Sequence, residues 1–169
     1  KNKISLNNKS ILIIGAGGAS RGVIGSLISL ADTPFSLINR DREKSIHLAN
    51  YFNELHGKTI VNFIEGKVDI ASFDVIVNCT PIGLNGECYT HNCLDGIPKS
   101  GTTLIDLLYH CIKTPFLRIG NESNKLVNGL DMFIGQGIAS LDLWLGNSTS
   151  NKINSTHLKE YLNSLCLKE

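Results

Sequence analysis

The run SILIIGAGGASRG, residues 10–22, decides the fold of this chain. Its first half is a short apolar run that predicts a buried strand over 10–14, and the glycines that follow it directly predict a tight turn. Apolar residues then recur with helical spacing, so we expect a helix over 19–31. A strand, a glycine-rich turn and a helix in this order predict the start of a dinucleotide-binding unit rather than an ordinary tight turn.

The glycines of this turn have separate expected tasks. Gly15 permits the tight turn, while Gly17 and Gly18 let the backbone approach a pyrophosphate with no Cβ in the way. The phosphates would then lie on the N-terminus of the helix, where free N–H groups favour an anion. Ser20 replaces the third glycine of the usual pattern, and its small side chain should still allow the helix to pack closely on the strand.

Short β-rich runs alternate with helical stretches along the rest of the chain, which is the pattern of a parallel sheet with crossover helices. Further strands are expected at 35–38, 59–64, 74–78, 102–106 and 125–127, and further helices at 42–55, 130–145 and 156–165. Because the strands are apolar on both faces, both faces must be covered. The sequence therefore predicts an α/β fold, a doubly wound (Rossmann-like) parallel sheet of about six strands with helices on both faces.

The composition excludes several classes of protein. With 42% apolar and 18% charged side chains, the 169 residues predict one domain with a hydrophobic core. A net charge of +1 favours neither nucleic acid nor an anionic membrane surface as a partner, and no apolar run is long enough to span a bilayer. The polar opening, 1–10, does not read as a secretory signal, and the five scattered cysteines predict reduced thiols. We therefore expect a cytoplasmic protein.

The end of the second expected strand bears on the choice of cofactor. Proteins that bind NAD usually place an acidic residue here for the ribose 2′-hydroxyl, whereas a basic residue suits the 2′-phosphate of NADP. Arg40 follows Asn39, and its guanidinium can bind a phosphate through two hydrogen bonds, with Lys44 one helical turn further on. Asp41 would repel a phosphate unless it turns away to cap the following helix. The sequence predicts NADP, with NAD as the alternative.

Later segments carry a more specific signal. They read NCTPIG (78–83), DLLY (106–109), TPFL (114–117), and NGLDMFIGQG (128–137) followed by LWLG (143–146). Together with GAGGASRG and NR, they closely resemble the C-terminal domain of the shikimate dehydrogenase family over nearly the whole chain, from about Leu6 to Gly146. Many dehydrogenases share the glycine turn. The combination specific to this family is NGxxM followed by Q and LW, found together with DxxY and TPFL.

The resemblance implies roles for the residues at matching positions. The residues that would hold the pyrophosphate are Gly15, Ala16, Gly17, Gly18 and Ala19. Those that would hold the adenosine ribose and its phosphate are Asn39, Arg40 and Lys44. Those expected around the nicotinamide and its ribose are Thr80, Pro81, Leu107, Gly129 and Met132. Tyr109 and Gln136 match the substrate contacts of this domain, and each offers a neutral hydrogen-bonding group to a polyhydroxylated ring.

The resemblance also implies an activity, the reversible NADPH-dependent reduction of 3-dehydroshikimate to shikimate in aromatic amino-acid biosynthesis. In this family, a lysine and an aspartate of the N-terminal domain handle the proton, and no segment here matches either motif. We therefore expect no catalytic residue in 1–169, which would be a dinucleotide-binding domain that is inactive alone and shares its small-molecule substrate with an absent N-terminal substrate domain. Residues 1–8 would be the tail of the interdomain connection, and 150–169 would carry a C-terminal helix.

Two other functions stay open. One is a quinate/shikimate dehydrogenase paralogue that uses NAD, and the other is a non-catalytic nucleotide-binding module. The substrate-facing polar groups of Tyr109 and Gln136 argue against the second, because a pure nucleotide binder has no evident use for them.

Smaller features have simpler interpretations. Asp106 is expected to anchor the loop that follows its strand, Ser155 to cap the last helix, and Trp144 to pack in the core. Three candidate metal ligands lie close together, but their number and spacing do not match a zinc site, so we expect no metal. These residues are Cys88, His91 and Cys93.

Overall fold

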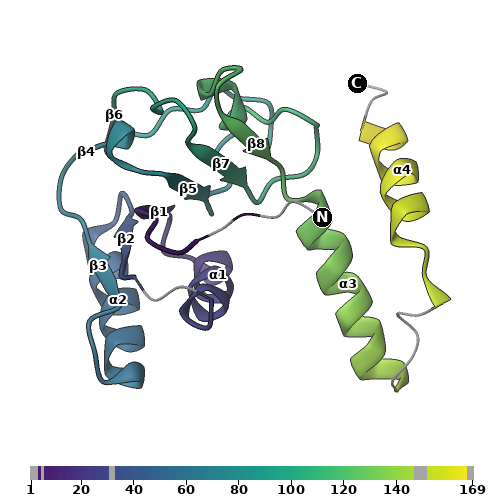
Figure 1. The fold of residues 1–169 in the computed structure, drawn as a ribbon, viewed down its shortest axis with the longest axis horizontal. Coiled ribbons are helices and arrows are strands. Elements are labelled where there is room, and N and C mark those ends of the chain that lie inside the picture. The colour runs from purple at the N-terminus through teal and green to yellow at the C-terminus, as the bar shows by residue number, and fades with distance from the viewer. Residues whose placement is uncertain (1–3, 5, 31–32, 147–151, 167–169) are drawn as a thin grey trace.

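The computed structural model of the chain describes residues 4, 6–30, 33–146 and 152–166, and its centre is a sheet of six parallel strands. The strands are β1 (Ile11–Ile14), β2 (Phe35–Ile38), β3 (Val61–Phe63), β5 (Val75–Asn78), β7 (Thr103–Asp106) and β8 (Lys125–Val127). Their spatial order is β3-β2-β1-β5-β7-β8, so the chain winds outward from β1 and then crosses back to wind outward the other way (Figure 1). This is the strand order of the dinucleotide-binding fold, and the expected Rossmann-like sheet is confirmed.

The two faces of the sheet are covered differently. The helices α1 (Gly18–Ile28) and α2 (Arg42–His56) lie on one face (Figure 1), where they pack against Ile11 and Ile13 of β1. Leu12 and Ile14 point to the other face, because successive side chains of a strand alternate. That face is covered by short elements, the 3₁₀ helices η1 (Ile70–Ser72) and η2 (Leu117–Ile119) and the small strand pair β4 (Val68–Asp69) and β6 (Leu94–Asp95).

The last two helices, α3 (Leu130–Leu145) and α4 (Ser155–Cys166), lie side by side next to the sheet rather than on it (Figure 1). An ion pair of 2.7 Å between Lys159 Nζ and Asp131 Oδ1 joins them. The prediction that Trp144 packs in the core is wrong, because α3 runs away from the sheet and leaves this side chain 77% exposed. Among the described residues, no helix has both the length and the apolar character that crossing a bilayer requires.

The helix ends follow short-range side-chain chemistry. Asp41 Oδ1 accepts a hydrogen bond from Lys44 N at 3.2 Å, so Asp41 caps α2 as expected. The predicted cap of α4 is wrong by one residue, because Asn154 Oδ1 accepts from His157 N at 3.0 Å while Ser155 is already helical. Of the two expected terminal segments, residues 1–3, 5, 150–151 and 167–169 lie outside the described residues.

Candidate dinucleotide-binding site

The site lies at the edge of the sheet where the parallel strands end. The pairing register aligns Ile38 with Ile14, Ile14 with Asn78, and Asn78 with Asp106. Four strand ends therefore form one row, although Ile14 and Asp106 are far apart in the sequence. The segments that leave this row carry most of the residues singled out above, and ligands of doubly wound folds bind at this edge.

The backbone conformation of the turn explains why its first residue, Gly15, is a glycine. Gly15 N donates to Ile38 O at 2.8 Å, and Gly15 has a φ of +104°, which side chains rarely adopt. A Cβ on Gly15 would also lie 3.1 Å from Thr80 Cγ2 and 3.3 Å from the Cys79 carbonyl. Ser20 is fully buried, and its Oγ donates to Gly15 O at 2.6 Å. Ser20 therefore allows close packing, as expected, and also holds the turn.

The other two glycines leave open space at the start of α1. Gly17 is the N-cap residue of α1, and among the described residues no side-chain cap hydrogen bond is made there. A Cβ placed on Gly17 or Gly18 would meet no atom within 4 Å. Ala16 and Ala19 flank the two glycines with small side chains. Free N–H groups beside open space are what an anionic pyrophosphate requires, so the residues present fit this group.

Two of the charged side chains after β2 pair with each other, whereas a third is exposed. Lys44 Nζ lies 3.2 Å from Asp41 Oδ2, and the Lys44 backbone N–H followed by its ammonium lowers the pKa of Asp41. Asn39 Nδ2 donates to Asp41 O at 3.0 Å and orders the bend. Arg40 is exposed, and within the described part of the chain no hydrogen bond or ion pair holds its guanidinium. Arg40 is thus more available to an incoming phosphate than Lys44.

A fully buried pair of polar residues links the ends of β5 and β7. Asp106 Oδ1 accepts from Asn78 Nδ2 at 2.9 Å and from Leu108 N at 3.2 Å, and its Oδ2 accepts from the Thr114 hydroxyl. Asn78 Oδ1 accepts from Thr80 N at 3.2 Å and from Thr80 Oγ1 at 2.7 Å. Burial raises the pKa of Asp106, while the hydrogen bonds lower it, Thr114 the most. Asp106 anchors the following loop, as expected, but it is also joined to the loop that carries Thr80.

Two other groups beside this pair resist ionisation. Burial, followed by the nearby charge of Asp106, raises the pKa of the Tyr89 phenol, whose OH donates to Asn78 Oδ1 at 3.3 Å. Burial raises the pKa of the Cys79 thiol to about 12. Both groups are therefore neutral and protonated at physiological pH, which makes Cys79 a poor nucleophile.

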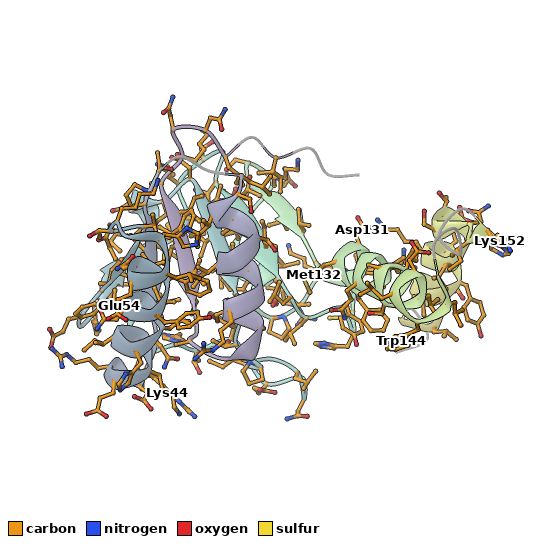
Figure 2. The ribbon with its side chains drawn as sticks, turned by 90° about the horizontal axis from the view of Figure 1, so that it is seen from below. Lys44, Glu54, Asp131, Met132, Trp144 and Lys152 are labelled. Carbon is orange, nitrogen blue, oxygen red and sulfur yellow. The ribbon has the colours of Figure 1, made fainter. Side chains whose placement is uncertain are left out.

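A cavity of about 590 Å³ between α1 and α3 brings together five of the residues predicted from the sequence. They are Gly18, Ala19, Leu107, Met132 and Gln136. Figure 2 shows Met132 on the side of α3 that faces the sheet, whereas Trp144 lies elsewhere on that helix. An adjoining pocket is lined by Leu107, Met132 and Gly129, and a Cβ on Gly129 would collide with the Leu107 carbonyl oxygen. Gly129 is therefore required by the close approach of two loops.

The remaining predicted residues do not line this cavity. Tyr109 is 39% exposed, and its ring stacks on that of Phe133 with centroids 4.3 Å apart. Thr80 and Pro81 lie on the loop after β5, Thr80 half-buried and Pro81 exposed. His91, one of the three candidate metal ligands, uses its Nδ1 to accept from Cys93 N at 3.3 Å. Within the described residues, no group of three or more metal-ligand side chains is placed to hold an ion.

Comparison with known proteins agrees with this geometry. The sequence model of the shikimate/quinate 5-dehydrogenase family matches residues 1–84. A shikimate dehydrogenase (NADP(+)) of Methanococcus maripaludis is 36% identical over 147 residues, which cover 83% of this chain and 51% of that protein. The chain belongs to the shikimate dehydrogenase family. It spans about half the length of the relatives that it matches.

Solved structures of other proteins share the fold of this chain. A chorismate mutase/shikimate 5-dehydrogenase fusion protein from Clostridium acetobutylicum superposes with a TM-score of 0.69 and 26% identity, over 97% of this chain and 57% of that one. A 5-ketofructose reductase of Gluconobacter superposes with a TM-score of 0.77 and 24% identity, over 96% of this chain and 58% of that one. The second likeness concerns the fold alone.

Sequence reasoning missed Asn78, Thr114 and Tyr89, which share hydrogen bonds with residues that it did single out. A signal was present for Asn78, because both Asn78 and Asp106 are polar residues that end otherwise apolar strands. The hydrogen bond between Asn78 and Asp106 depends on the order of the strands in space, which the sequence does not show and the structure does.

Proposed function

We propose that this chain is the NADP-binding domain of a shikimate dehydrogenase, an oxidoreductase that reversibly reduces 3-dehydroshikimate to shikimate with NADPH in aromatic amino-acid biosynthesis. The observation that supports it best is the start of α1, where Gly17 provides no side-chain cap and Gly17 and Gly18 leave open space, together with the exposed side chain of Arg40 after β2. The first feature suits a pyrophosphate and the second a 2′-phosphate. The names of the family relatives, which specify NADP(+), support the same cofactor.

The residues divide the dinucleotide into three parts under this proposal. The turn from Gly15 to Ala19 holds the pyrophosphate, and Asn39, Arg40 and Lys44 hold the phosphorylated ribose. Around the nicotinamide lie Thr80, Pro81, Leu107, Gly129 and Met132. When bound, the nicotinamide supplies or accepts the hydride. The substrate would be held on this side by Tyr109 and Gln136, which offer neutral hydrogen-bonding groups.

The chain should bind the cofactor without completing the reaction. We propose that 1–169 acts with a substrate domain that carries the groups which move the proton, since no such motif is found in this sequence. The odd number of cysteines in the sequence and their scattered positions support a cytoplasmic location as part of the same proposal.

Titration calorimetry of the 169-residue chain with NADPH and NADH tests the binding part, and an assay of shikimate-dependent NADP(+) reduction tests the rest. We expect tighter binding of NADPH than of NADH, and no turnover. Absence of any NADPH binding would overturn the proposal, and turnover by this chain alone would show that it carries the full set of reacting groups. Binding of NADH alone would favour the paralogue that uses NAD.

A further inference from the structure

Asp106 anchors its own loop, and it also lies where it can determine whether a side chain in the loop after β5 donates or accepts a hydrogen bond. It is fully buried, and three donors converge on its carboxylate, namely Asn78 Nδ2 from the end of β5, and Leu108 N and the Thr114 hydroxyl from the loop after β7. A carboxylate that receives three donors is the arrangement of the ionised form, which can only accept. The Asn78 side chain must therefore turn its NH₂ group toward Asp106.

A second contact fixes the same orientation of Asn78 independently. The Thr80 backbone N–H, which can only donate, points at the other end of the Asn78 amide at 3.2 Å, so that end must be the oxygen. The Thr80 hydroxyl donates its single proton to this oxygen at 2.7 Å. Its proton is then committed, and Thr80 Oγ1 already accepts from Ile82 N at 3.4 Å, so the hydroxyl can offer a ligand only its remaining lone pair.

We infer that Asp106 is a positioning residue that, through Asn78, makes the Thr80 hydroxyl a hydrogen-bond acceptor, so that the ligand group lying against Thr80 is a donor. This inference rests on the proposed function, in which Thr80 faces the nicotinamide ribose. A ribose hydroxyl is a donor of the required kind. Asp106 also holds Leu108, one residue before Tyr109, so the same carboxylate orders the loop expected to contact substrate.

The role is confined to one half of the dinucleotide, and this makes it testable. Adenosine 2′,5′-bisphosphate carries the phosphorylated adenosine but lacks the nicotinamide ribose. We expect Asp106→Leu, which removes the acceptor, and Thr80→Val, which removes the hydroxyl, each to weaken NADPH binding about threefold to tenfold. Neither variant should change the affinity for adenosine 2′,5′-bisphosphate.

Conservative variants distinguish the effect of hydrogen-bond direction from that of side-chain packing. Thr80→Ser keeps the hydroxyl and should bind NADPH like the original chain. Asp106→Asn can keep its oxygen toward Asn78 and Leu108 while its NH₂ group donates to the Thr114 hydroxyl, so it should also retain affinity. Thr102→Val is a matched control, because Thr102 is likewise buried and its hydroxyl donates to Phe73 O at 2.9 Å, but it lies just before the opposite end of β7.

The measurements are calorimetric titrations of both ligands, with urea unfolding to check each variant. The inference is supported if Asp106→Leu and Thr80→Val lose affinity for NADPH alone, and if Asp106→Asn and Thr80→Ser retain it. Equal loss of both ligands, no loss in Thr80→Val, or no rescue by Thr80→Ser overturns it. If Asp106→Leu does not fold, the two Thr80 variants decide. If the unaltered chain binds neither ligand, the proposed function fails instead, and the two failures remain distinct.

Discussion

The two ends of the glycine turn should respond to the same substitution in opposite ways. Gly15 has a φ of +104°, and an added Cβ would lie 3.1 Å from Thr80 Cγ2, whereas Gly18 has open space around it. Strain at a backbone conformation unsuited to a side chain costs about 1–3 kcal/mol, so Gly15→Ala should lower the free energy of unfolding by about that amount. In a domain of this size, each kcal/mol corresponds to a fall in Tm of about 2–4 °C.

Gly18→Ala should instead lower the affinity for NADPH and leave the fold stable. Gly18 begins α1, where alanine is tolerated, but the new methyl group would occupy the space that we assign to the pyrophosphate. Hydrogen bonds to a charged group contribute about 1.5–3 kcal/mol each, so displacing the phosphate by one such bond corresponds to a weakening of about tenfold to a hundredfold. Gly25→Ala, further along α1, is the control. Its Cβ would lie 4.0 Å from the Phe52 ring, and the helix should gain about 0.5–1 kcal/mol with no change in binding.

Urea unfolding and calorimetric titration with NADPH, carried out on all three variants, test this reasoning. We expect Gly15→Ala to be less stable, Gly18→Ala to bind weakly, and Gly25→Ala to show neither defect. Wild-type affinity in Gly18→Ala would refute the placement of the pyrophosphate. Unchanged stability in Gly15→Ala would refute the argument from backbone conformation.

Three further predictions follow from single contacts. Arg40→Ala should weaken NADPH binding about tenfold to a hundredfold and spare NADH, as measured by calorimetry, because only NADPH carries the 2′-phosphate; equal loss of both would contradict the assignment. The Ser10 N–H, followed by a lysine, lowers the pKa of Asp74 from 3.8 to about 2. Ionised Asp74 therefore stabilises the fold fully above the pKa of the unfolded chain, near 3.8, and this stabilisation is lost as the pH falls toward 2. Asp74→Asn should therefore lose on the order of 1–2 kcal/mol at neutral pH and less below pH 3 in urea unfolding. In a chimera where this chain replaces the matching half of the Methanococcus maripaludis relative, Tyr109→Phe and Gln136→Ala should raise the KM for shikimate more than that for NADP(+), and an equal rise in both would contradict the substrate role.

The strands could be predicted from the sequence because a strand buried on both faces needs an unbroken apolar run. The apolar runs at 11–14 and 75–77, and the run at 35–38 that only Ser36 interrupts, need no knowledge of their neighbours to be recognised. The exposure of Trp144 could not be predicted in this way. An apolar stripe on a helix shows that a surface is suited to burial, but not whether another element lies against it.

The same distinction separates the two parts of the site. At the ends of β1 and β2, the row at the sheet edge consists of Ile14 and Ile38, and the expected phosphate contacts come from backbone N–H groups. A backbone that must approach an anion at unusual dihedral angles requires glycine, and glycine leaves a visible pattern in the sequence. This is why a pyrophosphate site could be proposed from residues 10–22 alone.

At the ends of β5 and β7, the row consists of Asn78 and Asp106, and the work falls to side chains that pair across 28 positions of sequence. Such a pair leaves no local pattern, since each member taken alone resembles an ordinary polar residue at the end of a strand. The dihydronicotinamide ring of NADPH and its ribose carry no charge, so under the proposed function they are recognised through the direction of hydrogen bonds, and direction requires amide and carboxylate groups held rigidly in the interior. Under the proposed function, one edge of the sheet would bind the pyrophosphate through its backbone and the nicotinamide ribose through a buried polar network, and only the first of these could be inferred without the order of the strands.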